Sequence, residues 1–323
     1  MNRNRPLVAI ALALAPTLVA AQSSAWPTKP LRAIVPFATG AATDTIARLV
    51  LERMAKQLGQ PIVVENRPGA GGTIGVGAVA HAEPDGHTLL VHSNSLTVTA
   101  ATYRNLNYDT ARDLVGVIPL ASVPMVVVTS PAKGVRTLQE LVQRAKAAPD
   151  PIFYASAGAG GATHLGAERL RIAAGYKATH VPYKGTGDAL TDVIAGRVEY
   201  YFSPIGFAIP HLKTDKLVAL AVSSSKRSSA LPQVPTTVDA GFPDSQYDVW
   251  IAMFAPAKTP WAIVSRLNEE AAKAIRSPEI RERYAGLVMD EIIQTVDEFA
   301  EFLKQDFALN AELVKAAGVQ PGN

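Results

Sequence analysis

The chain has 323 residues, of which 48% are hydrophobic and 18% charged, with 23 glycines and 23 prolines. This length and composition indicate a globular protein of two domains and exclude a disordered or collagen-like chain. The net charge is only +3 and two of these charges, Arg3 and Arg5, lie in a segment expected to be removed, which argues against nucleic acid as a partner. The absence of cysteine excludes disulfides, thiolate metal sites and a cysteine nucleophile.

The N-terminal segment has the pattern of a secretory signal peptide. Arg3 and Arg5 precede an apolar stretch from residue 7 to residue 18, and Val19-Ala20-Ala21 provides residues suited to a cleavage site. A membrane-spanning helix needs about 20 apolar residues, so this stretch is too short for an anchor. We therefore expect residues 1–21 to be removed, or residues up to 25 if cleavage follows Ala25, which leaves a soluble exported protein.

Short apolar runs and amphipathic segments alternate along the rest of the chain. The predicted strands are residues 31–37, 62–64, 88–91, 125–129, 153–155, 181–183, 199–202 and 217–222. The predicted helices lie near 44–58, 138–148, 163–174, 188–195 and 260–275, with a last one after residue 295. Capping boxes start two of them, at Thr137 and Thr295, and Gly59, Gly175 and Gly196 are placed to end three others. This alternation predicts an α/β protein with mostly parallel sheets covered by helices.

Three glycine-rich turns, residues 36–44, 154–164 and 183–188, connect a predicted strand to a predicted helix. Each places small residues and unpaired backbone N–H groups at a helix N-terminus, an arrangement that binds anions without a basic side chain. In open α/β sheets ligands bind outside the carboxyl ends of the strands, where these turns lie. One such turn alone could be merely a tight connection. Together with a fourth glycine-rich segment at 68–72, they predict an anion-binding cleft.

Nucleotide and metal motifs do not match the sequence. The chain has no Gly-Lys pair for a phosphate loop. The third glycine of a dinucleotide fingerprint is replaced by Thr163 in one candidate and by Ile74 in the other. The spacing of His81, His87 and His92 is not that of a metal-binding motif. We therefore expect neither a metal nor a cofactor.

A serine hydrolase is the enzyme class that the sequence leaves open. Ser156 and His164 could form a triad with Asp192 or Asp44. However, Tyr154 stands where a nucleophile elbow requires glycine. We expect instead that Ser156 donates to a ligand or to the helix end, that His164 ties down its loop, and that the protein is not an enzyme.

Some side chains have two interpretations from sequence alone. Asp44 could contact a ligand, or it could accept from free N–H groups at the start of its helix. Phe202 and Tyr183, at strand ends, could pack in the core or form a wall of the ligand site. For Trp250, on an expected strand between domains, core packing is the simpler interpretation.

Several motifs occur together and in a fixed order: Pro36-Phe37-x-x-Gly40-x-x-x-Asp44, Glu65-Asn66-Arg67-Pro68-Gly69, Pro84-Asp85-Gly86-His87, Tyr154-Ala155-Ser156-x-Gly158-x-Gly160 with His164, Tyr183-Lys184-Gly185, and Phe254-Ala255-Pro256. With these motifs the chain resembles Bug-type extracytoplasmic solute receptors, the substrate-binding components of tripartite tricarboxylate transporters. The resemblance extends from Trp26 to the C-terminus.

The resemblance implies a two-lobed, type II-like periplasmic binding fold, with residues 27–124 and 249–323 in one lobe and 125–248 in the other. It implies a monomeric periplasmic receptor that takes up a small carboxylate, a dicarboxylate or an aromatic acid, and delivers it to the membrane subunits of a transporter. A ligand-binding protein linked to a membrane sensor would share the same site, and the exported serine hydrolase is the third possibility.

The resemblance also implies ligand-binding residues. They are Phe37, Ala38, Thr39 and Ala42 in the first turn, Ser93, then Ser156, Gly158 and Gly160 in the second turn, and Lys184, Gly185, Thr186 and Gly187 in the third. The residues themselves add Asp44, His164, Phe202 and Ser203 as candidates beside these positions. Two positions depart from the family pattern: Ala41 replaces a usual glycine, and Ser203 stands where aspartate is frequent. Because serine cannot neutralise an ammonium group, we expect a ligand whose far end is neutral or anionic and not a free amino acid.

Overall fold

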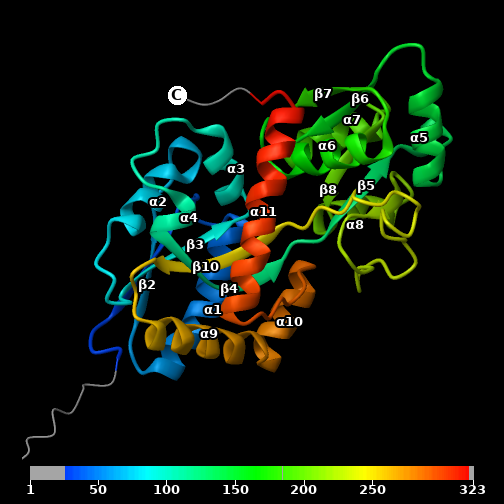
Figure 1. Cartoon of the computed structure of the whole chain (residues 1–323). Helices are drawn as coiled ribbons and strands as arrows, with labels where there is room; N and C mark the ends of the chain where they lie inside the picture. Colours follow the sequence, from blue (N-terminus) through cyan, green and yellow to red (C-terminus); the bar gives the residue numbers. More distant parts are fainter. Residues whose placement is uncertain (1–25, 184, 320–323) are drawn as a thin grey trace, which may run out of the picture.

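The computed structural model describes residues 26–183 and 185–319, which form two five-stranded sheets flanked by helices (Figure 1). The predicted signal peptide and Lys184 lie outside the described residues. The first sheet has the order β2-β1-β3-β10-β4 and contains β1 (Leu31–Val35), β2 (Ile62–Asn66), β3 (Thr88–Ser93), β4 (Leu114–Ser122) and β10 (Trp250–Pro256). The second has the order β7-β6-β8-β5-β9 and contains β5 (Met125–Thr129), β6 (Ile152–Ser156), β7 (Ala178–Pro182), β8 (Tyr200–Pro204) and β9 (Val218–Val222).

Each sheet has four strands in one direction and one reversed strand. In the first sheet β1 pairs in parallel with β2 and β3, whereas β10 runs antiparallel to β3 and β4. In the second sheet β6 pairs in parallel with β7 and β8, whereas β5 runs antiparallel to β8 and β9. The prediction of an α/β protein with mostly parallel sheets is therefore confirmed. The chain passes from the first sheet to the second between β4 and β5, and it returns between β9 and β10.

Helices cover both faces of each sheet. Around the first sheet lie α1 (Ala42–Leu58), the 3-10 helix η1 (Ala70–Gly72), α2 (Thr73–Ala80), α3 (Ser95–Thr102), α4 (Thr110–Asp113), α9 (Trp261–Ile275) and α10 (Pro278–Leu287). Around the second lie the 3-10 helix η2 (Pro131–Lys133), α5 (Leu138–Ala147), α6 (Ala162–Ala174), α7 (Thr186–Ile194) and α8 (Ile205–Leu212). Helices α1, α9 and α10 pack on one face of the first sheet, and α5 and α6 share one face of the second.

Local sequence signals account for many helix boundaries. The capping box predicted at Thr137 is present, with its hydroxyl accepting from the Glu140 N–H and the Glu140 carboxylate accepting from the Thr137 N–H. Gly59 ends α1 with φ +68°, a left-handed conformation that favours glycine. The predicted helices near 163–174 and 188–195 begin one and two residues earlier, at Ala162 and Thr186.

The last helix, α11 (Val296–Ala316), connects the two cores. Near its start Phe299 and Leu303 pack against the first sheet, and near its end Leu313 and Val314 belong to the core beside the second sheet. Figure 1 shows this helix, in red, running from the region of β4 to that of α6. The chain therefore joins the two halves a third time, through the buried face of a helix.

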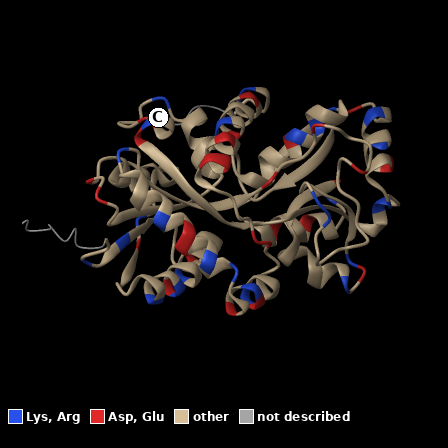
Figure 2. Ribbon diagram, turned by 60° about the horizontal axis from the view of Figure 1, so that its bottom comes forward, with Lys and Arg blue, Asp and Glu red and all other residues tan. Residues whose placement is uncertain are grey.

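Basic and acidic residues are interspersed along the ribbon of both halves of the molecule in the view of Figure 2, and no continuous stripe of either sign is visible. Within residues 26–183 and 185–319, no helix has both the length and the apolar composition needed to cross a bilayer.

Candidate functional site

The β1–α1 turn and the β6–α6 turn face one cavity of about 510 Å³ between the two sheets. Phe37 and Ala38 line it from the first turn, and residues 159–161 line it from the second. The rest of the lining is Pro36, Pro68, Gly69, Gly71, Gly72, Ser95, Val98, Thr99, Thr102, Tyr103 and Val319. The structure thus brings together two of the three glycine-rich turns and the glycine-rich segment at 68–72. None of the described lining residues is charged.

The first turn is held in place by a buried carboxylate. Asp44 is 2% exposed, and its Oδ2 accepts the Gly40 N–H at 2.9 Å while its Oδ1 accepts from Asn66 Nδ2 at 2.8 Å and Arg48 Nε at 3.0 Å. Burial alone would raise the pKa of Asp44, but the hydrogen bonds from Arg48, Gly40 and Asn66 outweigh it and lower the pKa below its usual value. Both carboxylate oxygens are therefore bonded within the protein, and Asp44 stabilises the turn without lining the cavity.

The free donors of the first turn lie at the start of α1. Ala42 is the first residue of this helix and is exposed, and its N–H group has no intrahelical acceptor, as in any first helical turn. Ala38 and Thr39, just before it, are also exposed, and Thr39 Oγ1 donates to Asn66 Oδ1 at 3.1 Å. The positive end of the α1 dipole and these small residues provide an environment that favours an anion.

In the second turn, the two glycines predicted as donors already have acceptors inside the protein. Gly158 N–H donates to Ser156 Oγ at 3.1 Å, and Gly160 N–H donates to His164 Nδ1 at 3.0 Å. Both glycines have positive φ, +138° and +74°, conformations in which other residues are strained. Among the described residues at the start of α6, the His164 N–H donates to the Gly161 carbonyl, whereas the N–H groups of Ala162 and Thr163 keep no acceptor within the protein.

Two imidazoles lie behind the second turn. His164 and His180 stack with ring centroids 3.7 Å apart and planes 8° apart, and His180 Nε2 lies 2.5 Å from Ser156 Oγ. Burial lowers the pKa of His164 to about 4, with His180 adding to the effect, and burial also lowers the pKa of His180. Both rings are therefore neutral at pH 7. Sequence reasoning missed His180, which reaches Ser156 only because β7 pairs with β6 in a register that places His180 opposite Tyr154.

The triad considered from the sequence is not assembled. Ser156 pairs with His180 and not with His164, and within the described residues no carboxylate is hydrogen-bonded to His180. Asp192 accepts from Tyr183 Oη at 2.7 Å and pairs with Arg197, and Asp44 belongs to the other turn. Ser156 itself is fully buried. This arrangement fits a structural hydroxyl better than a nucleophile.

Among the described residues, none from the third turn or from the end of β8 lines the cavity. Thr186 is the first residue of α7, and its Oγ1 lies 3.0 Å from Tyr201 Oη. Gly185 immediately precedes this helix, and Gly187 is its exposed second residue. Phe202 is fully buried in the core, where it packs against Gly166 of α6. Ser203 is also fully buried, and its hydroxyl donates to the Pro204 carbonyl at 3.1 Å.

A second residue that sequence reasoning missed, His92, supports the first turn. Its ring is fully buried and lies edge-on to Phe37, with centroids 5.0 Å apart, and its Nδ1 bonds to the Ser93 carbonyl at 2.9 Å. Burial lowers the pKa of His92 to about 4, so the ring is neutral. The predicted residue Ser93 lies beside the cavity, where its hydroxyl is 2.8 Å from Ser95 Oγ.

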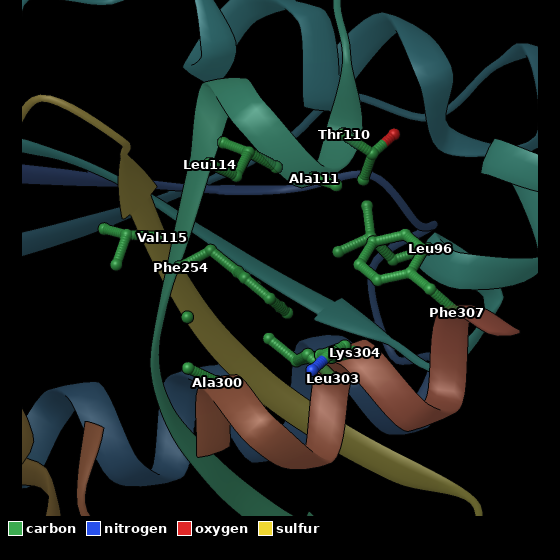
Figure 3. Close-up of a pocket in the computed structure, with 11 residues that line it drawn as sticks. Leu96, Thr110, Ala111, Leu114, Val115, Phe254, Ala300, Leu303, Lys304 and Phe307 are labelled. Carbon is green, nitrogen blue, oxygen red and sulfur yellow. The ribbon is translucent and has the colours of Figure 1, made fainter. Parts of the chain in front are cut away.

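A separate cavity of about 420 Å³ lies between β4, β10, α3, α4 and α11 (Figure 3). Leu114, Phe254, Leu303 and Phe307 point toward it, and Lys304 is its only charged lining residue among those described. None of the glycine-rich turns contributes to its lining. Its walls therefore lack the glycine-rich turns that line the cavity between the sheets.

Two mixed α/β sheets, joined by two chain crossings and enclosing a cavity lined by glycine-rich turns, define a two-lobed solute-binding protein. Residues 46–319 match the family model described as tripartite tricarboxylate transporter family receptor, and the chain belongs to this family. The predicted resemblance to Bug-type receptors is confirmed: BugT of Bordetella pertussis (strain Tohama I) is 34% identical, with 99% of each chain covered.

Two solved structures are also similar to the chain. MatC from Rhodopseudomonas palustris with bound malate is 32% identical with a TM-score of 0.71, and the match covers 90% of this chain and all of that one. R. palustris Rpa4515 with adipate is 30% identical with a TM-score of 0.75, and the match covers 92% of this chain and all of that one.

Proposed function

We propose that the protein is an exported periplasmic receptor that captures a small organic acid between its sheets and delivers it to the membrane subunits of a tripartite tricarboxylate-type transporter. The observation that carries this proposal is that glycine-rich helix N-termini from both sheets face one cavity of about 510 Å³. Backbone donors and two helix dipoles favour a carboxylate there. The malate and adipate named with MatC and Rpa4515 support the same ligand class.

The ligand is a dicarboxylate or an aromatic acid and not a free amino acid. The described cavity lining contains no carboxylate that could neutralise an ammonium group. Ser203 does not decide against an amino acid, because its hydroxyl is buried and bonded to the Pro204 carbonyl. Apolar and hydroxyl side chains on α3, among them Val98 and Thr99, form the wall beyond the two turns.

Binding is coupled to closure of two lobes, residues 27–124 with 249–323 and residues 125–248. The lobes close about the two crossing segments and helix α11, whose end packs in the core beside the second sheet. A ligand that contacts turns on both lobes stabilises the closed arrangement over the open one. The receptor acts as a monomer.

A thermal-shift screen of residues 22–323 with malate, adipate, benzoate and glutamate, followed by calorimetry, tests the proposal. A ligand at about 100 times its Kd adds roughly 2.7 kcal/mol of stability, which raises the midpoint of thermal unfolding by a readily measured amount. The protein is unfolded, dialysed and refolded first to remove any bound acid. A screen in which no acid binds, or in which only glutamate binds, contradicts the proposal.

A pair of variants locates the site. Ala38→Asp places a carboxylate on the exposed cavity wall, and we expect it to abolish binding of the acid by charge repulsion. Ala262→Asp adds the same charge to the exposed first turn of α9, where we expect no effect on binding. Equal affinities for both variants would place the ligand elsewhere.

The serine hydrolase alternative rests on the 2.5 Å separation of Ser156 Oγ and His180 Nε2. Ser156→Ala must abolish turnover of an ester substrate in a hydrolase, whereas in a receptor it only weakens binding. The sensor alternative shares the binding site. Deleting the gene in cells distinguishes the two. Loss of a transport receptor stops uptake of the acid, whereas loss of a sensor changes gene expression.

A further inference from the structure

The β6–α6 turn is fixed by two side chains that do not line the cavity between the sheets. His164 accepts the Gly160 N–H through Nδ1 at 3.0 Å. His180 contacts Ser156 Oγ through Nε2 at 2.5 Å, and Ser156 Oγ accepts the Gly158 N–H at 3.1 Å. Each imidazole therefore controls one glycine of the turn, and each does so through a different ring nitrogen.

The hydrogen bond from Gly160 requires a neutral His164 ring with a lone pair on Nδ1. Because Gly160 donates to His164 Nδ1, this nitrogen carries a lone pair and the proton lies on Nε2. The Ser156 hydroxyl has one proton, which it donates either to His180 Nε2 or to the Gly158 carbonyl at 3.1 Å, and in the second case it accepts from Nε2. Both arrangements leave an oxygen lone pair for the Gly158 N–H. Protonation of His164 on Nδ1 would break its bond to the turn.

The surroundings keep the rings neutral. His164 is 4% exposed and lies 3.7 Å from His180, so neither ring readily accepts a charge beside the other. The charged groups facing the pair are Glu168 and Arg171 of α6, which pair with each other at 2.6 Å. Tyr154 of β6 stacks on His180. The end of α11, residues 316–319, lines the hollow beside the rings and has no titratable side chain.

We propose, resting on the function above, that His164 and His180 are positioning residues for ligand binding. His164 accepts the Gly160 N–H directly, and His180 holds the Ser156 hydroxyl that accepts the Gly158 N–H, so the two rings keep the turn in the shape that directs the start of α6 at the carboxylate. The inference assigns a separate hydrogen-bonding nitrogen to each ring, Nδ1 in His164 and Nε2 in His180.

Amide substitutions test this assignment, because an asparagine amide occupies the position of imidazole Nδ1 and a glutamine amide that of Nε2. We expect His164→Asn and His180→Gln to retain the wild-type Kd within about threefold. We expect His164→Gln and His180→Asn, like the leucine variants at both positions, to raise the Kd at least tenfold. The probes are malate, adipate and benzoate, and the Kd is measured by calorimetry for whichever acid the wild type binds.

Hydrogen–deuterium exchange gives a second measurement that needs no ligand. The peptide covering 157–162 is expected to exchange at the wild-type rate in His164→Asn and His180→Gln and faster in the swapped variants. If both amides behave alike at one position, in affinity and in exchange, the assignment of nitrogens is wrong. If the wild type binds no acid, the proposed function fails, while the exchange rates still decide whether the rings position the turn.

Discussion

Asp306, on α11, is a carboxylate whose charge is expected to destabilise the folded protein at neutral pH. It is 7% exposed, and its Oδ2 accepts from Thr97 Oγ1 at 2.6 Å and from Asn310 Nδ2 at 3.0 Å. Burial raises the pKa of Asp306 to about 6, despite these hydrogen bonds, and the carboxylate of Asp248 adds to the rise. Asp306→Asn removes the charge and retains an oxygen that can accept from the same donors.

The free energy follows from linkage. Because the pKa is 3.8 in the unfolded chain and about 6 in the folded protein, the folded state binds the proton more tightly. The stability that the proton provides is fully present below pH 3.8 and is lost as the pH rises through 6. The difference of about 2.2 units at about 1.36 kcal/mol each gives roughly 3 kcal/mol, an upper value because the new amide N–H₂ also needs acceptors.

Urea unfolding followed by circular dichroism at pH 4 and pH 8 tests the prediction. We expect Asp306→Asn to be more stable than wild type by up to about 3 kcal/mol at pH 8 and nearly equal to it at pH 4. Glu312→Gln, which removes an exposed charge from the same helix, is the matched control and is expected to differ little at either pH. A gain that is the same at both values of pH, or a loss at pH 8, would refute the reasoning.

Three further predictions concern stability measured by thermal or urea unfolding. Gly166→Ala places a Cβ 2.3 Å from the Phe202 ring and is expected to cost about 1–3 kcal/mol of stability. Gly187→Ala, whose Cβ would meet open space, is expected to be neutral or stabilising by up to about 1 kcal/mol. Equal effects of the two variants would contradict this packing. Thr137→Ala removes the cap of α5 and is expected to cost about 0.5–2 kcal/mol, and an unchanged midpoint would argue against the capping box. Burial lowers the pKa of His92 to about 4, so its neutral form provides stability above pH 6.5 that is lost as the pH falls through 4. We therefore expect His92→Asn to lose less stability than the wild type over this interval. An equal loss would count against this prediction.

The sequence was sufficient wherever the physical cause is local. The capping boxes at Thr137 and Thr295 and the end of α1 at Gly59 depend on residues within one turn of a helix, and all three are present as predicted. The alternation of strands and helices likewise indicated the fold class, because burial on one face imposes a period on each segment. The family motifs add an expectation that the periodicity does not contain, namely the kind of ligand.

Features that depend on distant pairings could not be predicted. His180 reaches Ser156 only through the register between β6 and β7, and Asp44 meets Asn66 only because β1 and β2 are neighbours. The glycines predicted as donors, Gly158 and Gly160, are engaged by side chains whose positions depend on these pairings. Sequence reasoning therefore located the turns, but it could not show that the N–H groups of Gly158 and Gly160 have acceptors within the protein.

The position of β10 has a consequence for the order in which the chain becomes folded. β10 lies between β3 and β4 in the first sheet, although it is about 130 residues later in the sequence than β4. During synthesis the first sheet stays divided until β10 is made, whereas β5 to β9 of the second sheet are contiguous in the chain. We expect the second sheet to form first and the nascent protein to remain incompletely folded for most of its synthesis, a delay compatible with the export proposed above.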